Sequence, residues 1–435
     1  MPLRPEPVPE PPAWWADGLL ALIGRLVTVT AFAAVIALLV MFGKPLLQRV
    51  AVLEPDSPPT QVAKPSDPLT ENEAPATRAL VPTAGIVATP GAAPPATAQG
   101  QQAALSPISK SPQDSSSAVR GVTDSEIRFG ISAPFTGPAK ELGQNMKIGI
   151  EAAFNVANAK GGVYGRQLQL IAADDGYEPT RTVTAMKELD ERDQVFGLIG
   201  NVGTPTAAVA LPYALDRKML FFGAFTGAGL RNDPPDRGGS ASPILRLNYQ
   251  RNTIDVDDTV AQLRQNRGFP IKAVIMVPTY RAAAKFIEKT RDLYPDMIYT
   301  SVSFAGSTAL AEELMLLGKR YATGVIVTQV VPAVDGHSSL VLDYKSALAK
   351  YFPGQEPDYV SLEGYVDANV LIAALQRNGA ELDTERLVGT LENIRDLDIG
   401  LGTPMTFSRS EHQGVHKVWG TQLDETGHYQ PIDLQ

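Results

Sequence analysis

Strands and helices alternate along residues 122–222, and this alternation restricts the possible folds more than any other feature of the chain. The first predicted strand has apolar side chains at every second position, which indicates one buried face; they are Ile127, Phe129 and Ile131. A helical pattern follows, and the same order returns twice before a fourth strand at 219–222. Such alternation predicts a parallel, doubly wound α/β sheet with a ligand crevice outside the carboxyl ends of its strands.

The turn at Val195–Thr206 is the most informative single segment of this region. An apolar strand ends there in a turn rich in Gly and Thr, and residues of helical composition follow from Ala207 to Arg217. The free N–H groups and positive dipole end of a helix N-terminus favour a carboxylate or a phosphate. Thr204 and Thr206 could therefore contact an anionic ligand, or they could simply cap the helix.

Composition excludes several classes of function. The chain has 435 residues, a formal net charge of -9 and no cluster of Lys and Arg, which argues against a nucleic-acid partner. It has no cysteine. Disulfides, thiolate metal sites, a catalytic thiol and a lipid-modified N-terminal Cys are therefore excluded.

One segment, Leu19–Phe42, is long and apolar enough to cross a bilayer, which takes about 20 residues. The apolar run is too long for the core of a signal peptide, and no cleavage site of small residues follows it. We therefore predict an uncleaved membrane anchor at 19–43. Basic residues flank both of its ends equally, so charge leaves its orientation open.

Three further regions flank or follow this anchor. A short Pro-rich tail at 1–18 precedes it, and a Pro-, Ala- and Ser-rich stretch at 44–120 cannot bury enough apolar surface to fold, so we predict a disordered linker. Residues 121–435 form the predicted binding domain. Its lobes are assigned as follows: the first comprises about 121–237 and 340–400, the second about 238–339 and 401–435.

The second half of the chain repeats the α/β alternation less regularly. The predicted elements are strands at Lys272–Val277 and Thr323–Val331, helices at Ala282–Tyr294, Ser338–Tyr351 and Tyr359–Asn378, and a strand-rich tail from Met405 to Tyr429 with turns at Gly414 and Gly427.

An ordered set of short motifs resembles the type I periplasmic binding proteins, in the branch of the leucine/isoleucine/valine-binding proteins. The resemblance covers about Val122 to Leu434 and implies two α/β lobes joined by a hinge, which close around a small solute. Its motifs are Thr136-Gly137-Pro138, Gly161-Gly162-Val163-Tyr164-Gly165-Arg166, Asp174-Asp175-Gly176-Tyr177-Glu178-Pro179, Thr204-Pro205-Thr206, the run Leu220 to Gly227, Val330-Val331-Pro332 and Leu362-Glu363-Gly364-Tyr365.

The resemblance implies a ligand site in the first lobe. Thr204, together with Thr206, matches the turn that binds the ligand's carboxylate in this family. The carbonyl of Ala224 and the hydroxyl of Thr226 match the groups that receive its ammonium. Where many members place an aromatic side chain against the ligand, this chain has Leu142, so the contact there would be apolar without stacking.

The second lobe departs from the family pattern. After Arg237 the chain runs almost directly into Ile244–Tyr249, which looks like the family's next strand. On the order of fifty residues, about one strand and two helices, are missing relative to the pattern. Their loss would expose a sheet edge and apolar helix faces. Tyr280 is a candidate for the aromatic residue that closes over the ligand, and Ser307 falls near the acidic group that receives the ammonium in amino-acid binders.

Other kinds of site have weaker support. His412 and His416 have the spacing of a helical metal pair, but Gly414 lies between them and a turn with two solvated histidines is favoured. Asp174 and Asp175 could hold a cation, yet carboxylates at a strand end before Gly more often cap a turn. The chain has no nucleophile elbow, dinucleotide fingerprint or P-loop, so we predict no enzyme, no metal and no cofactor.

The sequence thus predicts a protein of the cytoplasmic membrane with a single span, a short cytoplasmic tail and a periplasmic or extracellular binding domain. We expect this domain to bind an amino acid or a related carboxylate by lobe closure and to deliver it to an ABC permease. A ligand sensor working with a membrane signalling protein, or a degenerate scaffold without tight binding, is the alternative. An α/β enzyme is a third class for which no catalytic constellation was found.

Overall fold

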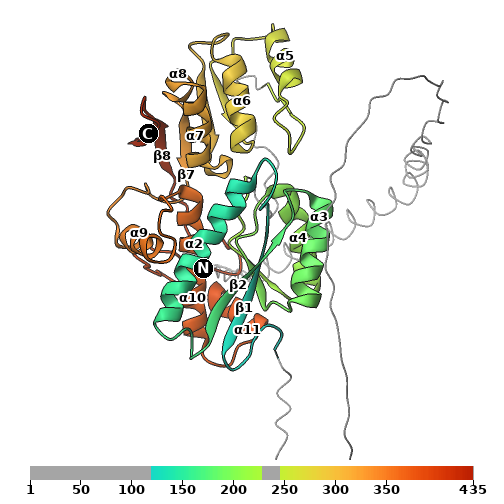
Figure 1. The fold of residues 1–435 in the computed structure, drawn as a ribbon, viewed down its shortest axis with the longest axis vertical. Coiled ribbons are helices and arrows are strands. Elements are labelled where there is room, and N and C mark those ends of the chain that lie inside the picture. Colours follow the sequence, from blue (N-terminus) through green and yellow to red (C-terminus); the bar gives the residue numbers. More distant parts are fainter. Residues whose placement is uncertain (1–118, 228–244, 435) are drawn as a thin grey trace, which may run out of the picture. The chain divides into compact units, whose positions relative to one another are not determined.

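The computed structural model describes residues 119–227 and 245–434. The predicted tail at 1–18, the anchor at 19–43 and nearly all of the linker at 44–120 lie outside these residues, as does Arg237. Within the described ranges, no helix is long and apolar enough to span a membrane. These ranges form two α/β lobes, each built on its own sheet (Figure 1).

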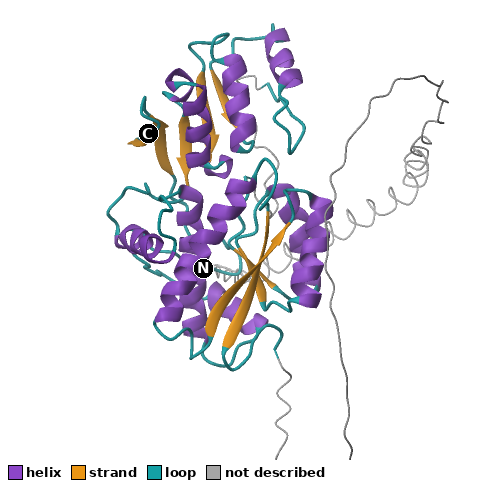
Figure 2. Ribbon diagram, viewed as in Figure 1, coloured by secondary structure: helices purple, strands orange, loops and turns teal. Residues whose placement is uncertain are grey.

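The first lobe has a parallel sheet with the strand order β2-β1-β3-β4, as the alternation of the sequence predicts. Its helices lie on both faces of the sheet (Figure 2). The elements are β1 (Glu126–Ala133), α2 (Lys140–Ala159), β2 (Gln167–Asp174), α3 (Pro179–Lys187), the π-helical turn η1 (Glu188–Arg192), β3 (Gly197–Ile199), α4 (Thr204–Asp216) and β4 (Leu220–Phe222).

Three helices late in the chain complete the first lobe: α9 (Ser339–Tyr351), α10 (Tyr359–Asn378) and α11 (Thr384–Glu392). Helix α10 packs along α2, and two glycines allow the close approach. A Cβ atom on Gly149 would lie 1.8 Å from the Ser361 carbonyl oxygen, and one on Gly364 would lie 2.6 Å from that of Met146. Backbone contacts of this kind fix where the two helices cross.

The second lobe has a five-stranded sheet with the order β5-β6-β7-β8-β9. Strands β5 to β7 are parallel, and β8 and β9 are antiparallel to their neighbours. The elements are α5 (Asp257–Gln265), β5 (Ala273–Met276), α6 (Tyr280–Thr290), β6 (Ile298–Val302), the 3₁₀ turn η2 (Ser303–Ala305), α7 (Ser307–Leu317), α8 (Lys319–Ala322), β7 (Ile326–Gln329), β8 (Trp419–Leu423) and β9 (Tyr429–Ile432).

The prediction of a strand at Ile244–Tyr249 is wrong for its described part. Residues 245–249 pair with no strand, although Leu245, Leu247 and Tyr249 pack against the core and the residues between them are exposed. The alternation in the sequence therefore reflects an extended segment with one packed side. The tail from Met405 is also less regular than predicted, because only isolated bridges precede β8.

The second lobe has both kinds of exposure that were expected. Strand β5 lies at a sheet edge, and apolar side chains are exposed on a helix as well as on the sheet: Leu316 in α7 is 85% exposed, Ile275 in β5 is 77% exposed and Ile298 in β6 is 51% exposed. The run Lys272–Val277 forms the predicted strand without being buried on both faces. The shortening of this lobe relative to the family stays a prediction.

The contact between α2 and α10 yields a direct test. We expect Gly149→Ala to lower the free energy of unfolding by about 2 kcal/mol or more, because the added methyl group meets the Ser361 carbonyl and the helices must separate. The matched control is Gly389→Ala in α11, where an added Cβ meets nothing within 4 Å. This variant should gain up to about 1 kcal/mol from helix propensity. Urea denaturation measures both changes, and equal effects would contradict the packing described.

Candidate ligand site between the two lobes

The turns that follow β3 and β4 lie side by side in the first lobe. The Phe225 amide donates to the Asn201 carbonyl at 2.8 Å, and the Gly203 amide donates to the Phe225 carbonyl at 2.8 Å. Gly203 has φ 110° and an added Cβ would lie 2.4 Å from the Tyr177 ring, so only glycine fits there. This backbone pairing brings the N-terminus of α4 next to the loop that contains Ala224 and Thr226.

Four of the five first-lobe residues predicted to bind ligand therefore share one region, but their side chains have different surroundings. Thr204 is the first residue of α4, and its half-buried hydroxyl accepts a hydrogen bond from the Gly227 amide at 3.1 Å. Ala224 and Thr226 are half-buried on the adjacent loop. Thr206 is buried, and its hydroxyl donates back to the Val202 carbonyl at 2.6 Å. Thr206 thus stabilises the turn but does not cap the helix: the N-cap residue is Gly203, and the Thr206 hydroxyl donates to a carbonyl and does not accept from a helix N–H group. A ligand contact by Thr206 stays a prediction.

An aromatic cluster connects this region to the second lobe. The ring of Phe304, in η2, lies 5.5 Å from that of Phe225 and 6.4 Å from that of Tyr177 between centroids. All three side chains are buried. Tyr177 and Phe225 lie within the motifs of the sequence without a predicted ligand role, and Phe304 lies in none of them. Phe304 is therefore a second aromatic residue facing the first-lobe turns, and the role predicted for Tyr280 stays a prediction.

Leu142 and Tyr280 meet next to this cluster. A Cβ atom on Gly306 would lie 2.4 Å from the Leu142 side chain and 3.7 Å from the Tyr280 ring, so the residue after η2 must be small. Tyr280 is buried, and its hydroxyl makes no well-formed hydrogen bond to another described residue. Burial raises the pKa of Tyr280 to about 12, so the phenol stays neutral. Leu142 thus lies close to Gly306 of the second lobe, and its predicted apolar contact with a ligand stays a prediction.

Ser307 is placed differently from the other predicted residues. Its side chain is fully buried in the second lobe, and its hydroxyl is hydrogen-bonded to the Gln329 amide at 3.0 Å. Gln329 in turn donates to the Thr421 hydroxyl, and the Tyr429 hydroxyl donates to the Ser307 carbonyl. This network connects α7 to the sheet and engages the hydroxyl that was predicted to receive an ammonium. A ligand contact by Ser307 remains a prediction.

Asn201 is a polar residue of the β3 turn that the sequence analysis did not select. It is 3% exposed, and neither its side-chain oxygen nor its nitrogen has a hydrogen-bond partner in the described structure. Leaving a buried amide unsatisfied costs about 1–3 kcal/mol, so such groups usually have a partner in the functional state. The sequence does mark Asn201 in one way: it is a polar residue in the turn two positions after the end of the buried strand β3.

A second contact between the lobes is polar. Arg251 donates to the Tyr177 carbonyl and forms an ion pair with Glu178 at 3.0 Å. Asn252 donates to the Gly176 carbonyl at 3.0 Å and to the Glu178 carboxylate at 2.7 Å. The hydrogen bond from Asn252, with the nearby Arg251, lowers the pKa of Glu178. We name this contact the polar latch.

Asp174 and Asp175 precede the polar latch in the sequence, and their hydrogen bonds hold the first-lobe turn that forms one side of it. Asp174 accepts hydrogen bonds from the Phe135 amide at 2.8 Å and the Thr136 hydroxyl at 2.6 Å. Although burial opposes ionisation, these bonds lower the pKa of Asp174 to about 2. Asp175 is buried and accepts hydrogen bonds from Ser132 and from the Tyr177 amide. The turn interpretation is therefore supported, and no group of three potential metal ligands occurs among the described residues.

Two α/β lobes that meet at paired turns and a helix N-terminus define a two-lobed binding protein. The comparisons with known proteins give its family: a family model described as periplasmic binding protein matches residues 126–243 and 244–428. The chain belongs to the type I periplasmic binding proteins, in the branch of the leucine/isoleucine/valine-binding proteins. This is a family of solute-binding proteins.

Individual relatives agree with this assignment. The chain is 28% identical over 225 residues to the Leu/Ile/Val-binding protein homolog 7 of Brucella melitensis, an alignment that covers 51% of this chain and 50% of the relative. The chain thus spans about half the length of these curated relatives. It is also 39% identical over 67 residues to the Leu/Ile/Val-binding protein homolog 2 of Brucella abortus, 15% of this chain and 18% of that protein.

Solved structures share the fold. The crystal structure of a possible leucine/isoleucine/valine-binding protein from Rhodopirellula baltica matches with a TM-score of 0.65 and 33% identity, over 73% of this chain and 98% of that one. A branched-chain amino acid transporter substrate-binding protein from Streptococcus pneumoniae, in complex with isoleucine, matches with a TM-score of 0.58 and 14% identity, over 71% and 99%. The second likeness shows the fold alone.

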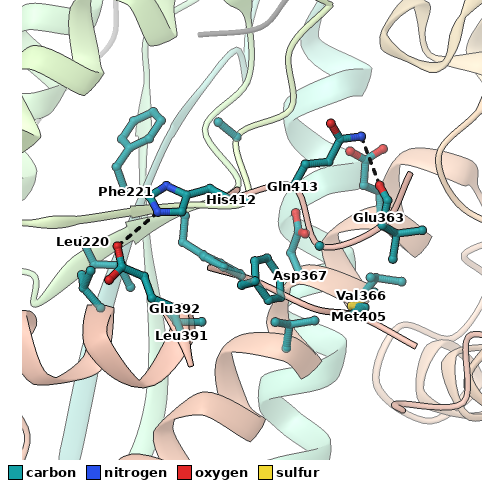
Figure 3. A pocket seen from close by; sticks show the side chains of 18 of the residues that line it. Leu220, Phe221, Glu363, Val366, Asp367, Leu391, Glu392, Met405, His412 and Gln413 are labelled. Carbon is teal, nitrogen blue, oxygen red and sulfur yellow. Dashed lines mark hydrogen bonds and ion pairs between the residues drawn. The ribbon is translucent and has the colours of Figure 1, made fainter. Parts of the chain in front are cut away.

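A separate cavity of about 540 Å³ lies beside β4, and Figure 3 shows its lining. The walls are mostly apolar, but Glu363 and Asp367 of α10 face it, and no hydrogen bond or ion pair joins either carboxyl to another described residue. Burial raises the pKa of Asp367 to about 7, and burial together with Asp367 raises that of Glu363 well above its usual value. His412, at the rim, pairs with Glu392 at 3.2 Å.

The raised pKa of Asp367 predicts a pH dependence of stability. The folded state holds this proton more tightly than the unfolded state, so stability falls as pH rises from about 4 through 7. We expect Asp367→Asn to be more stable than the parent chain by about 1–2 kcal/mol at pH 8, with a smaller difference at pH 5. Exposed Asp296→Asn serves as the control. Thermal unfolding at both pH values measures the effect, and a gain that is the same at both would contradict the assignment.

Proposed function

We propose that the domain binds an amino acid, or a related small carboxylate, between its lobes. The observation that carries this proposal is the N-terminus of α4, which presents backbone N–H groups and Thr204 next to the loop of Ala224 and Thr226. Donors at a helix N-terminus suit a carboxylate, and the carbonyl and hydroxyl of the adjacent loop suit an ammonium. The Asn201 side-chain amide and the Tyr280 hydroxyl, which make no well-formed hydrogen bond within the described part of the chain, are additional candidates for ligand contacts.

The second lobe would complete the site by closing over this surface. Phe304 packs against Phe225, so closure brings an aromatic ring next to the carboxylate- and ammonium-binding groups. The polar latch adds hydrogen bonds that form only when the lobes meet. Ligand binding and latch formation then stabilise the same closed state.

We further propose that the domain is extracytoplasmic, is held at the membrane by the predicted anchor at 19–43, and delivers its solute to an ABC permease. The similar protein from Streptococcus pneumoniae is described as a substrate-binding protein of a branched-chain amino acid transporter. A tether that keeps a binding domain near its permease raises the effective concentration of the loaded domain. A membrane signalling protein is the other partner that this arrangement suits.

One observation favours the alternative of a sensor or scaffold that does not bind tightly. The Thr204 hydroxyl already accepts a hydrogen bond from the Gly227 amide, and Phe304 packs directly against Phe225. A ligand would have to compete with these contacts.

Calorimetry of the full chain with a panel of amino acids and small carboxylates separates the two possibilities. For a binder, we expect saturable binding of at least one amino acid, and a loss of tenfold or more in affinity for Thr204→Ala and for Thr226→Ala, because each removes a hydrogen bond to a charged group.

The matched control is Thr184→Ala, an exposed threonine of α3 far along the chain from both turns. It should bind as the parent chain does. A folded protein that binds nothing in the panel would contradict the proposal and favour the scaffold. Binding that Thr204→Ala and Thr226→Ala leave unchanged would place the ligand elsewhere.

A further inference from the structure

One face of the second sheet gathers much of the exposed apolar surface of the described chain. Strand pairing places Ile275, Thr300, Ile326 and Gln422 in one row across four strands, with their side chains on the same face. Five large apolar side chains on this face, or in line with it just beyond a strand end, are 49–77% exposed: Ile275, Val277, Ile298, Val418 and Leu434. We name this surface the open sheet face.

The opposite face of the same sheet is covered. Helices α6, α7 and α8 lie over it (Figure 1), and their apolar side chains join Tyr299 of β6 and Val327 of β7 in the core. Tyr299 and Val327 are fully buried, whereas their strand neighbours Ile298 and Ile326 point to the open sheet face. The two sides of one sheet thus differ sharply in burial.

An apolar sheet face that is this exposed is normally covered by a binding partner. Sheets with parallel strands are normally buried on both faces, and a contiguous apolar patch of several hundred Å² on a soluble domain marks an interaction site. None of the side chains that β5, β6, β7, β8 and β9 direct to the open sheet face is charged. The surface can therefore be covered without separating an ion pair or burying an unpaired charge.

We propose that the occupant is a second copy of this chain, with the two open sheet faces packed against each other. An uncharged face meets its own copy without like-charge repulsion, and two sheets can stack about 10 Å apart with their side chains interdigitated. A two-fold axis near the central strand β7 would make the contact self-complementary. Thr328, half-buried on β7, would then lie close to its counterpart.

The size of the face sets the strength of the contact. Five strands about 4.8 Å apart and about five residues long span roughly 24 by 16 Å. This is smaller than the area of about 800 Å² per partner in a standard stable interface. The dimer is therefore weak and forms where the local concentration is high, as it would be among copies held at one membrane.

Cysteine cross-linking of the full chain tests this proposal cleanly, because the chain has no cysteine of its own. Thr328→Cys places one thiol on the open sheet face. Leu316→Cys is the matched control, because Leu316 is 85% exposed on α7, on the covered side of the sheet. With a bis-maleimide of about 10 Å span, we expect Thr328→Cys to give at least tenfold more covalent dimer than Leu316→Cys.

A second experiment adds a positive charge to the open sheet face and measures the same cross-linking. Ile275→Lys in the Thr328→Cys chain should reduce the covalent dimer to the level of the control, whereas Leu316→Lys should not. Both sites are highly exposed, so neither substitution should change the thermal midpoint much. Equal cross-linking at positions 328 and 316 would overturn the proposal. So would a thiol at position 328 that is shielded from labelling without forming a homodimer, since another protein would then cover the face.

Discussion

The backbone pairing between the turns after β3 and β4 is the contact on which the proposed site depends. Hydrogen bonds between Phe225 and residues Asn201 and Gly203 extend the parallel ladder by one step beyond the strands. That extra step places the first turn of α4 against the 224–227 loop and directs the Phe225 ring toward the second lobe. Without it, donors for a carboxylate and acceptors for an ammonium would not share one surface.

The second lobe depends on the same surface through two different contacts. Phe304 provides an apolar contact with Phe225 and Tyr177, while Arg251 and Asn252 provide polar contacts with the turn at Glu178. The apolar contact is insensitive to salt, whereas the half-exposed ion pair weakens as salt screens it.

The first lobe could be predicted from the sequence because local pattern and tertiary structure agree there: β1, β2 and β3 are each followed by a helix, and turn glycines such as Gly203 separate strand from helix. The second lobe was harder. Strand β6 was missed because Ile298 faces solvent and polar residues alternate with apolar ones, and Phe304 was missed because a lone aromatic in a short turn has no periodicity. The Ser307 hydroxyl is engaged by Gln329, a tertiary partner 22 residues away that no local pattern reveals.

Hydrogen–deuterium exchange of the full chain, with and without a mixture of amino acids, tests the central claim most directly. The account predicts that ligand slows exchange in three segments from both lobes: residues 200–206, 223–227 and 303–307. Slower exchange confined to α10 around Glu363 and Asp367 would place the ligand in the cavity beside β4 and contradict the account. No change anywhere in a folded chain would contradict solute binding between the lobes altogether.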